Sequence, residues 1–467
     1  MSFQLRPLIK TDLPLKYALL SKVCSYNELH STFGYASSLT VNDAVYTALK
    51  NRLEIAIDDQ DIVKAKSRLD EARSELYPRL DLFGNSRYTK TINKFEPVQI
   101  SFELLGKTNT ISPTKDVPEY QSYLSVQATQ RLFTGGNVTG KIEGAKERIS
   151  QNEMLKELHK REIILAVIKA YWELKRADKI YGIEKEKAKH SEIILATAKA
   201  RYEKGTIAGL EMEKSEVDFI NTKGDLLQAA SARNIAKVGL LKEMGIIETG
   251  NETTLIPQDE PLNILHQSYL KTPDGAVEDA LLSRPEIKHI KKRISANEAD
   301  IMIAKSTYYP QVDLVGNYNW TGWHNNNLAG SWREMTKDYW SIMLKFDFNI
   351  FEGYATKSRV NQALAEARAS RIIMDKERQI ILAGIKRSHY IMTDSAERIT
   401  TLFRNLSLSE KNLEAAKKQF ELGIMTLTQV AEYNLSLADT RKRYICALID
   451  FEIAKTEYRW ALGEDLV

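Results

Sequence analysis

Hydrophobic and polar residues alternate along four segments of the chain, which predicts four amphipathic β-strands. The alternation is strongest over residues 340–350 and recurs over 80–88, 124–129 and 311–320. Strands of about ten residues with one apolar and one polar face are typical of a membrane β-barrel around a wet lumen. A soluble sheet packed on helices would show the same alternation. The pattern alone therefore leaves both interpretations open.

Aromatic residues cluster at the ends of the second pair of predicted strands. Four of the six tryptophans lie in or beside this pair. Aromatic side chains at strand ends are typical of the girdle that a barrel places at the membrane interface. We therefore predict four membrane-interface aromatics: Trp320, Trp323, Tyr339 and Trp340.

The chain is a tandem duplication. The sequence Tyr-Pro-Arg-Leu-Asp-Leu-Phe-Gly-Asn at 77–85 returns 232 residues later as Tyr-Pro-Gln-Val-Asp-Leu-Val-Gly-Asn at 309–317. Leu-Phe-Thr-Gly at 132–135 and Tyr-Glu-Lys-Gly at 202–205 return 218 residues later as Ile-Phe-Glu-Gly and Phe-Glu-Leu-Gly. Each copy must therefore build the same strands and helices.

Long stretches without proline predict unusually long helices. Residues 136–202 and 354–420 would each form a helix of about 67 residues, roughly 100 Å long. Glycine turns at Gly205 and Gly423 lead into return helices of half that length. Two further half-length helices end before Pro78 and Pro310. The predicted return helices are 210–244 and 427–462, and the other half-length helices are 41–76 and 274–307. If the half-length helices stack end to end in pairs, the two long and four half-length helices give four antiparallel columns of equal length.

These elements divide the chain into four parts. We assign 1–38 to an N-terminal segment that could act as an atypical export signal. The first structural repeat is 39–243, a linker follows at 244–272, and the second repeat is 273–467.

Composition narrows the function. A net charge of +4, from 66 basic and 62 acidic residues, gives no reason to expect a nucleic-acid partner. No stretch reaches the roughly 20 apolar residues of a membrane helix. The histidines and the two cysteines show no metal-ligand spacing, so we expect no metal, no cofactor and no catalytic site.

Residues 135–141 resemble a phosphate-binding loop, but Ile142 replaces the hydroxyl residue that such a loop needs.

Four strands are too few to close a membrane barrel, and open edges in lipid would leave backbone groups unpaired at a cost of several kcal/mol each. Two copies would make a narrow barrel of eight strands that side chains fill. Three copies give twelve strands and twelve helical columns. We therefore predict a homotrimer that shares one 12-stranded β-barrel and a 12-column α-helical tunnel.

With its duplication, strand openings, strand exits and glycine turns, the chain resembles the TolC-like outer-membrane efflux protein family, also called outer membrane factors. The resemblance covers residues 40–462. It implies a mainly α-helical trimeric duct in the outer membrane, with a large periplasmic portion. It also implies a periplasmic adaptor (membrane fusion) protein and an inner-membrane pump as partners, with outer-membrane lipid around the barrel. Small molecules or proteins would pass through, in drug efflux or type I secretion.

The resemblance also assigns functional residues. The two turns would form the periplasmic tip that meets the adaptor, with contacts from Lys204, Gly205, Thr206, Leu210, Leu422, Gly423 and Thr426. Some family members carry two acidic residues, three apart, that ring the closed aperture. The matching positions are Gln429 and Glu432, of which only one is acidic. Three copies of Glu432 near the axis would still attract cations.

The alternative is a periplasmic coiled-coil adaptor or scaffold protein without a channel. An adaptor would have a single helical hairpin between other domains, and the duplicated order of strands and helices argues against it.

Overall fold

The computed structural model describes residues 37–90, 100–104, 107–111, 119–246, 255–261, 281 and 284–466. Nearly all of the expected export segment 1–38 and most of the expected linker 244–272 lie outside these residues. The chain divides into two compact units. Unit 1 comprises residues 1–59, 154–288 and 376–467, and unit 2 comprises 60–153 and 289–375.

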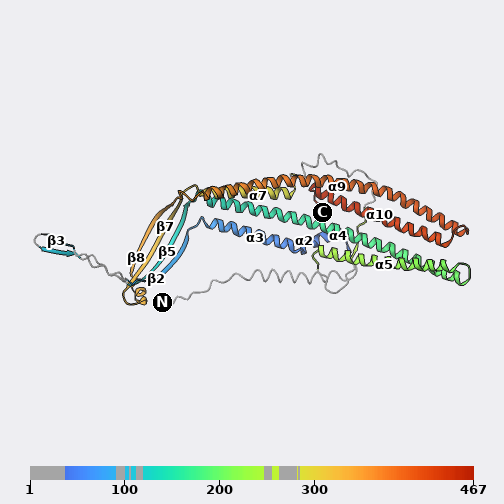
Figure 1. Ribbon diagram of the computed structural model, residues 1–467, viewed down its shortest axis with the longest axis horizontal. Helices are drawn as coiled ribbons and strands as arrows, with labels where there is room; N and C mark the ends of the chain where they lie inside the picture. The colour runs from blue at the N-terminus through green and yellow to red at the C-terminus, as the bar shows by residue number, and fades with distance from the viewer. Residues whose placement is uncertain are drawn as a thin grey trace. The chain divides into compact units, whose positions relative to one another are not determined.

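Unit 2 contains a four-stranded antiparallel sheet in the order β2-β5-β7-β8 (Figure 1). Its strands are β2 (Arg79–Tyr88), β5 (Tyr120–Phe133), β7 (Gln311–His324) and β8 (Lys337–Asp347). All four correspond to the predicted strands. The β2–β5 connection carries a hairpin of β3 (Ile100–Leu104) and β4 (Lys107–Ile111), and the β7–β8 connection carries the short helix α8 (Leu328–Arg333).

Four helices extend from the sheet in the order of its strands. They are α3 (Leu53–Ser74), α4 (Asn137–Glu203), α7 (Pro285–Ser306) and α9 (Ala355–Glu421). Side-chain contacts join neighbours in the row within unit 2. Asn152 on α4 donates to the Asp61 carbonyl of α3, Arg148 on α4 pairs with Asp300 on α7, and Glu298 on α7 pairs with Arg371 on α9.

Glycines bring α4 and α7 into close contact. A Cβ atom on Gly140 would lie 2.8 Å from Ile303 Cγ1 and 3.1 Å from the Ala299 carbonyl oxygen. A Cβ atom on Gly144 would lie 3.3 Å from Ala299 Cβ. The glycines of the phosphate-loop lookalike therefore have a packing role, because a side chain at Gly140 would push the two helices apart.

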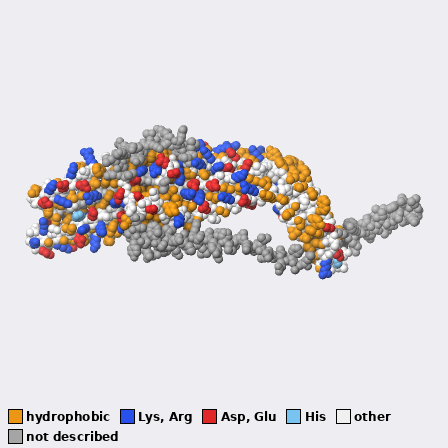
Figure 2. Space-filling model, turned by 180° about the vertical axis from the view of Figure 1, so that it is seen from behind, with side chains coloured by type: hydrophobic (Ala, Val, Ile, Leu, Met, Phe, Trp, Pro, Cys, Tyr) orange, Lys and Arg blue, Asp and Glu red, His pale blue; other side chains and the backbone are white. Residues whose placement is uncertain are grey.

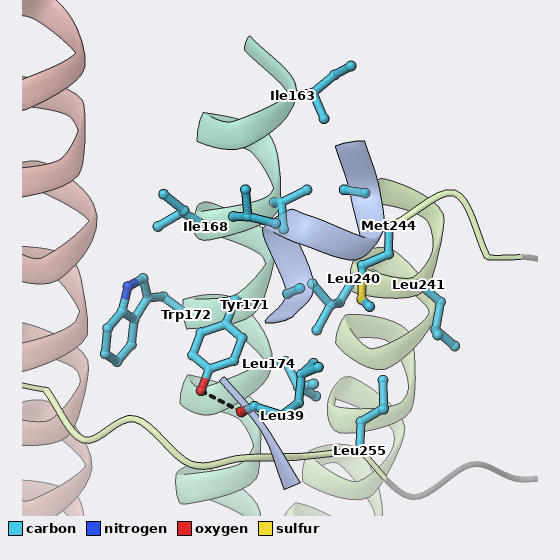
Figure 3. Close-up of a cluster of buried hydrophobic side chains, with 14 of the residues drawn as sticks. Leu39, Ile163, Ile168, Tyr171, Trp172, Leu174, Leu240, Leu241, Met244 and Leu255 are labelled. Atoms are coloured by element: carbon cyan, nitrogen blue, oxygen red, sulfur yellow. Dashed lines mark hydrogen bonds between the residues drawn. The ribbon is translucent and has the colours of Figure 1, made fainter. Parts of the chain in front are cut away.

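Unit 1 contains a core where α2 (Val41–Asn51), α4 and α5 (Gly209–Glu243) meet the parallel strands β1 (Ser37–Leu39) and β6 (Leu255–Pro257). Tyr171 is fully buried there, and its hydroxyl donates to the Leu39 carbonyl oxygen at 3.0 Å (Figure 3). The same hydroxyl lies 2.8 Å from Asp259 Oδ2 and accepts from the Asp259 backbone N–H. Burial raises the pKa of Tyr171 well above its usual value, so the hydroxyl keeps its proton.

A second core in unit 1 joins α9 to α10 (Leu427–Leu462). Its most buried side chains include Ile385, Met392, Ala447 and Tyr458. The two return helices, α5 and α10, match the predicted ranges to within one residue at each end.

Two predicted helices differ from the structure. The expected helix 41–76 breaks at Arg52, whose ψ of 125° ends α2 before α3 begins. Of the expected helix 274–307, residue 281 and Pro285–Ser306 are helical, Arg284 is not, and residues 274–280, 282 and 283 lie outside the described residues. Proline suits a first helical position.

Candidate functional site at the two glycine-ended hairpins

The α4–α5 and α9–α10 hairpins of unit 1 end in the same backbone turn. Gly205 (φ 68°) donates its N–H to the Tyr202 carbonyl at 2.8 Å, and the Thr206 N–H donates to Arg201 at 2.9 Å. Gly423 (φ 75°) and Ile424 make the equivalent bonds to Phe420 and Gln419, at 3.0 and 2.9 Å. This pair of bonds is the Schellman C-cap, which needs a left-handed residue. Both positions are open in space, so the backbone conformation is what requires glycine.

The helices that leave the turns begin differently. Thr426 starts α10 with a capping box: its hydroxyl accepts from the Gln429 N–H, and Gln429 Oε1 accepts from the Thr426 N–H at 2.9 Å. Ala208 starts α5 without a side-chain cap. The exposed Gln429 side chain, at one of the two predicted constriction positions, therefore caps a helix.

Three contacts join the two hairpins close to the turns. Lys214 Nζ on α5 lies 3.2 Å from Glu432 Oε1 on α10. The Thr428 hydroxyl donates to Glu211 Oε1 at 3.0 Å. The Arg201 guanidinium lies 5.5 Å from the centre of the Phe420 ring. Both side chains of the ion pair are more than half exposed, so the pair contributes at most about 1 kcal/mol.

The sequence did not single out Lys214 or Glu211 as site residues. They lie 218 residues before Glu432 and Gln429, the offset that relates the two repeats. The equivalent position in the other repeat was therefore the signal that could have identified them. The charges are complementary across the two hairpins, because the ammonium group of Lys214 faces the carboxylate of Glu432.

The turns expose large apolar side chains to solvent: Tyr202, Leu210, Leu422 and Ile424. The predicted tip residues Lys204, Gly205, Thr206, Gly423 and Thr426 lie in or beside the same turns. A small core of Leu413, Ala416, Val430 and Leu437 supports the second hairpin from within. Exposed apolar side chains that gather on one surface are typical of protein-interaction sites.

The predicted interface aromatics lie on both faces of the sheet in unit 2. Trp320 and Trp340 share the apolar face, because Trp320 pairs with Leu124, and Trp340 with Tyr318. Trp323 and Tyr339 lie on the other face, paired with Gln121 and Asn319. On the apolar face, Trp340, Ile342 and Phe346 are each at least 65% exposed, and Figure 2 shows hydrophobic side chains gathered over the sheet. Trp332 of α8, which was not among the predicted interface aromatics, donates its indole N–H to the Ser86 hydroxyl at 3.0 Å.

Within the described part of the chain, no helix is both long enough and apolar enough to cross a membrane. Nor do the described residues contain a group of three or more His, Cys, Asp or Glu side chains placed to hold a metal ion.

Comparisons with known proteins identify the family. The model of the family described as "Outer membrane efflux protein" matches residues 44–245 and 276–464. The cation efflux system protein CusC of Escherichia coli (strain K12) is 21% identical, over 86% of this chain and 82% of its own. The outer membrane protein TolC of Vibrio cholerae is 22% identical, over 76% of this chain and 80% of its own. The crystal structure of the Campylobacter jejuni CmeC outer membrane channel shares the fold, with a TM-score of 0.75 at 15% identity over 91% of this chain and 87% of that one.

These matches confirm the predicted family, the mainly α-helical fold and the outer-membrane location with a large periplasmic portion. Because the relatives are channel and efflux proteins, they also confirm that the chain is not an enzyme. The chain belongs to the outer membrane efflux protein family.

Proposed function

We propose that this protein forms a homotrimeric exit duct in the outer membrane. An inner-membrane pump would deliver cargo, a periplasmic adaptor would connect pump and duct, and the cargo would pass passively to the exterior. The observation that carries the proposal is the four-stranded sheet, whose two edges are open in the part of the chain that the structure describes.

The strands are long enough for a membrane barrel, but the four-stranded sheet does not close on itself. Its strands are 10, 14, 14 and 11 residues long, against the roughly 9–11 residues that span a bilayer. Among the described residues, β2 and β8 each pair on one side only. Each unpaired backbone group in hydrocarbon costs several kcal/mol, so the edges must meet strands from other copies. Three copies would give the closed barrel of twelve strands.

The helices support the same assembly. α5 exposes an apolar stripe at helical spacing: Val217, Ile220, Leu227, Ile235 and Val238. A stripe of this kind in a periplasmic helix needs a partner helix. A neighbouring copy provides one if the helices form the proposed 12-column tunnel.

The hairpin tips are the proposed adaptor contact and gate. Leu210, Leu422 and Ile424 are at least 70% exposed, as expected of side chains that await a protein partner. Glu432 would ring the aperture in three copies. Opening would require the two hairpins to separate, which breaks the Lys214–Glu432 and Glu211–Thr428 contacts.

The cargo is a small molecule, an ion or a protein delivered by the pump. The relative CusC is named a cation efflux system protein, so cations are the first cargo to test. Secreted proteins are the second.

Native mass spectrometry of the detergent-purified, uncrosslinked protein tests the proposal, together with conductance in a planar lipid bilayer. We expect a trimer that conducts ions. A soluble, non-conducting monomer would overturn the duct and favour the scaffold or adaptor alternative. Heat-modifiable migration on a denaturing gel, expected for a barrel and not for a scaffold, gives an independent check.

A further inference from the structure

We propose that, between copies of this chain, α3 of one copy docks on α9 of the next in the way that α7 docks on α4 within one copy. An ion pair between Arg68 of one copy and Glu366 of the next would hold this interface. The inference rests on the proposed trimer and names the surfaces that meet in it.

Within one copy, strand pairing sets the helix contact. Three residues join β5 to α4, and four join α7 to β7. Because β5 pairs with β7, these short connections bring α4 and α7 together. The contact carries a two-pronged ion pair, in which Arg148 Nη2 lies 2.8 and 2.6 Å from the two carboxylate oxygens of Asp300.

The two open edges of the sheet have the same construction. Four residues join α3 to the edge strand β2, and seven join the edge strand β8 to α9. If β8 of one copy pairs with β2 of the next, α9 must therefore meet the next copy's α3. The duplication makes α9 the equivalent of α4, and α3 the equivalent of α7.

The positions equivalent to the Arg148–Asp300 pair of α4 and α7 also carry one basic and one acidic residue, but in exchanged places. Glu366 lies 218 residues after Arg148, and Arg68 lies 232 residues before Asp300. Arg68 and Glu366 are both exposed, and neither has an ion-pair partner among the described residues. Their charges remain complementary although both have changed. Two surfaces that contact each other would keep this relation, and an unrelated pair of solvent-exposed positions would not need it.

The turn that precedes each helix supports the same docking. Gly135 (φ 59°) and Gly136 (φ 92°) match Gly353 (φ 58°) and Tyr354 (φ 67°), so both turns have positive φ at the same two positions. In the first repeat this turn is covered, since a Cβ on Gly135 would lie 2.7 Å from the Ser306 carbonyl oxygen and from Tyr309 Cβ.

In the second repeat the same turn is bare. Apart from its two chain neighbours, no described residue has a heavy atom within 4 Å of a Cβ on Gly353, and Phe351 and Tyr354 are each 73% exposed. The equivalent of Tyr309 is Tyr77, which is also exposed, at 71%. Tyr77 of a second copy is therefore the side chain that would cover this turn. Tyr354 is the one non-glycine with positive φ in the described chain, a strained conformation that a fixed surrounding would maintain.

Charge reversal tests the interface. Arg68→Glu and Glu366→Arg would each place like charges together at three sites per trimer. We expect each to raise the monomer fraction in native mass spectrometry after mild heating, on the order of tenfold. The double variant Arg68→Glu/Glu366→Arg should restore the wild-type fraction. The control is Arg371→Glu, which breaks an exposed ion pair with Glu298 inside one copy and should leave the monomer fraction unchanged.

A cysteine pair gives a second measurement that does not depend on interface strength. Ser358 and Glu71 are the equivalents of Gly140 and Ile303, which are in contact within one copy. In a Cys24→Ser/Cys446→Ser background, Glu71→Cys with Ser358→Cys should give covalent dimers and trimers after oxidation. Each single cysteine should leave monomers on a denaturing gel.

The outcomes separate this inference from the proposed function. A conducting trimer without cross-links, in which both single reversals behave like Arg371→Glu, overturns the interface and leaves the duct intact. A double variant that dissociates as readily as the single ones overturns the Arg68–Glu366 pair. A monomeric, non-conducting wild type overturns the proposed function itself.

Discussion

Gly182 and Gly205 lie in or just beyond the same helix, α4, yet alanine should have opposite effects at the two positions. Both are open in space, but only Gly205 has a left-handed backbone, with φ of 68°. Gly205→Ala should lower the stability of the tip by about 1–2 kcal/mol, because the new Cβ meets the following carbonyl oxygen. Gly182→Ala should raise the stability of the helix by about 0.5–1 kcal/mol.

Amide hydrogen exchange at residues 200–207 and 178–186 measures the two effects. Faster exchange at the tip in Gly205→Ala, with slower exchange in mid-helix in Gly182→Ala, is the expected pair of results. Protection that changes in the same direction in both variants would contradict the assignment of Gly205 to a Schellman turn.

At the residue scale, the sequence showed which positions need a special backbone but not which side chains meet. Gly205 and Gly423 could be predicted because a glycine that follows a long proline-free stretch ends a helix. The repeat offset of 218 residues could have pointed to Lys214 as the equivalent of Glu432, but it could not show that the two side chains contact each other, since they meet only after both hairpins form. The Thr426–Gln429 capping box was visible in the spacing and was passed over in favour of a role in the pore.

At the scale of elements, the break between α2 and α3 shows where local pattern fails. Residues 41–76 read as one helix because no glycine or proline interrupts them. The break occurs at Arg52, whose guanidinium lies 3.1 Å from Glu243 Oε2 and also reaches the Lys242 carbonyl at the end of α5. A contact 190 residues away therefore ends the helix. The two 67-residue helices were predicted to within one residue at each end.

The buried hydroxyl of Tyr171 gives a prediction at this scale. It bonds to the Leu39 carbonyl of β1 and to Asp259, just beyond β6, and so connects both strands to α4. Tyr171→Phe would leave those buried polar groups without their partner and should lower the free energy of unfolding by about 1–3 kcal/mol. Tyr181→Phe, on the same helix, is the control. Thermal unfolding followed by circular dichroism should separate the two variants, and equal shifts would show that the Tyr171 bonds contribute nothing.

At the scale of the whole molecule, the duplication carried most of what could be predicted. It gave the pairing of strands with helices, the open edges and hence the need for other copies. The packing of α8 on the sheet was not predictable: Ser331 of α8 is fully buried and lies 2.6 Å from Ser122. Nothing in the alternation of β5 marks Ser122 as a contact for a helix 209 residues away.

In the proposed duct, the charge of Glu432 near the aperture gives a further prediction. In each copy, Lys214 compensates Glu432, and the Gln429 side chain caps α10. Lys214→Gln would leave three uncompensated Glu432 carboxylates around the axis and remove one of the contacts between the hairpins. We expect higher conductance and a cation preference that rises by up to about fivefold, since the exposed pair is worth at most about 1 kcal/mol.

Reversal potentials in a planar bilayer with a salt gradient measure that preference. Glu432→Gln should shift the potential in the opposite direction, because it leaves Lys214 uncompensated. Lys223→Gln, at an exposed lysine farther along α5, should leave the potential at its wild-type value. If all three variants match the wild type, then Lys214 and Glu432 lie away from the ion path, and the narrowest part of the duct is elsewhere along the helices.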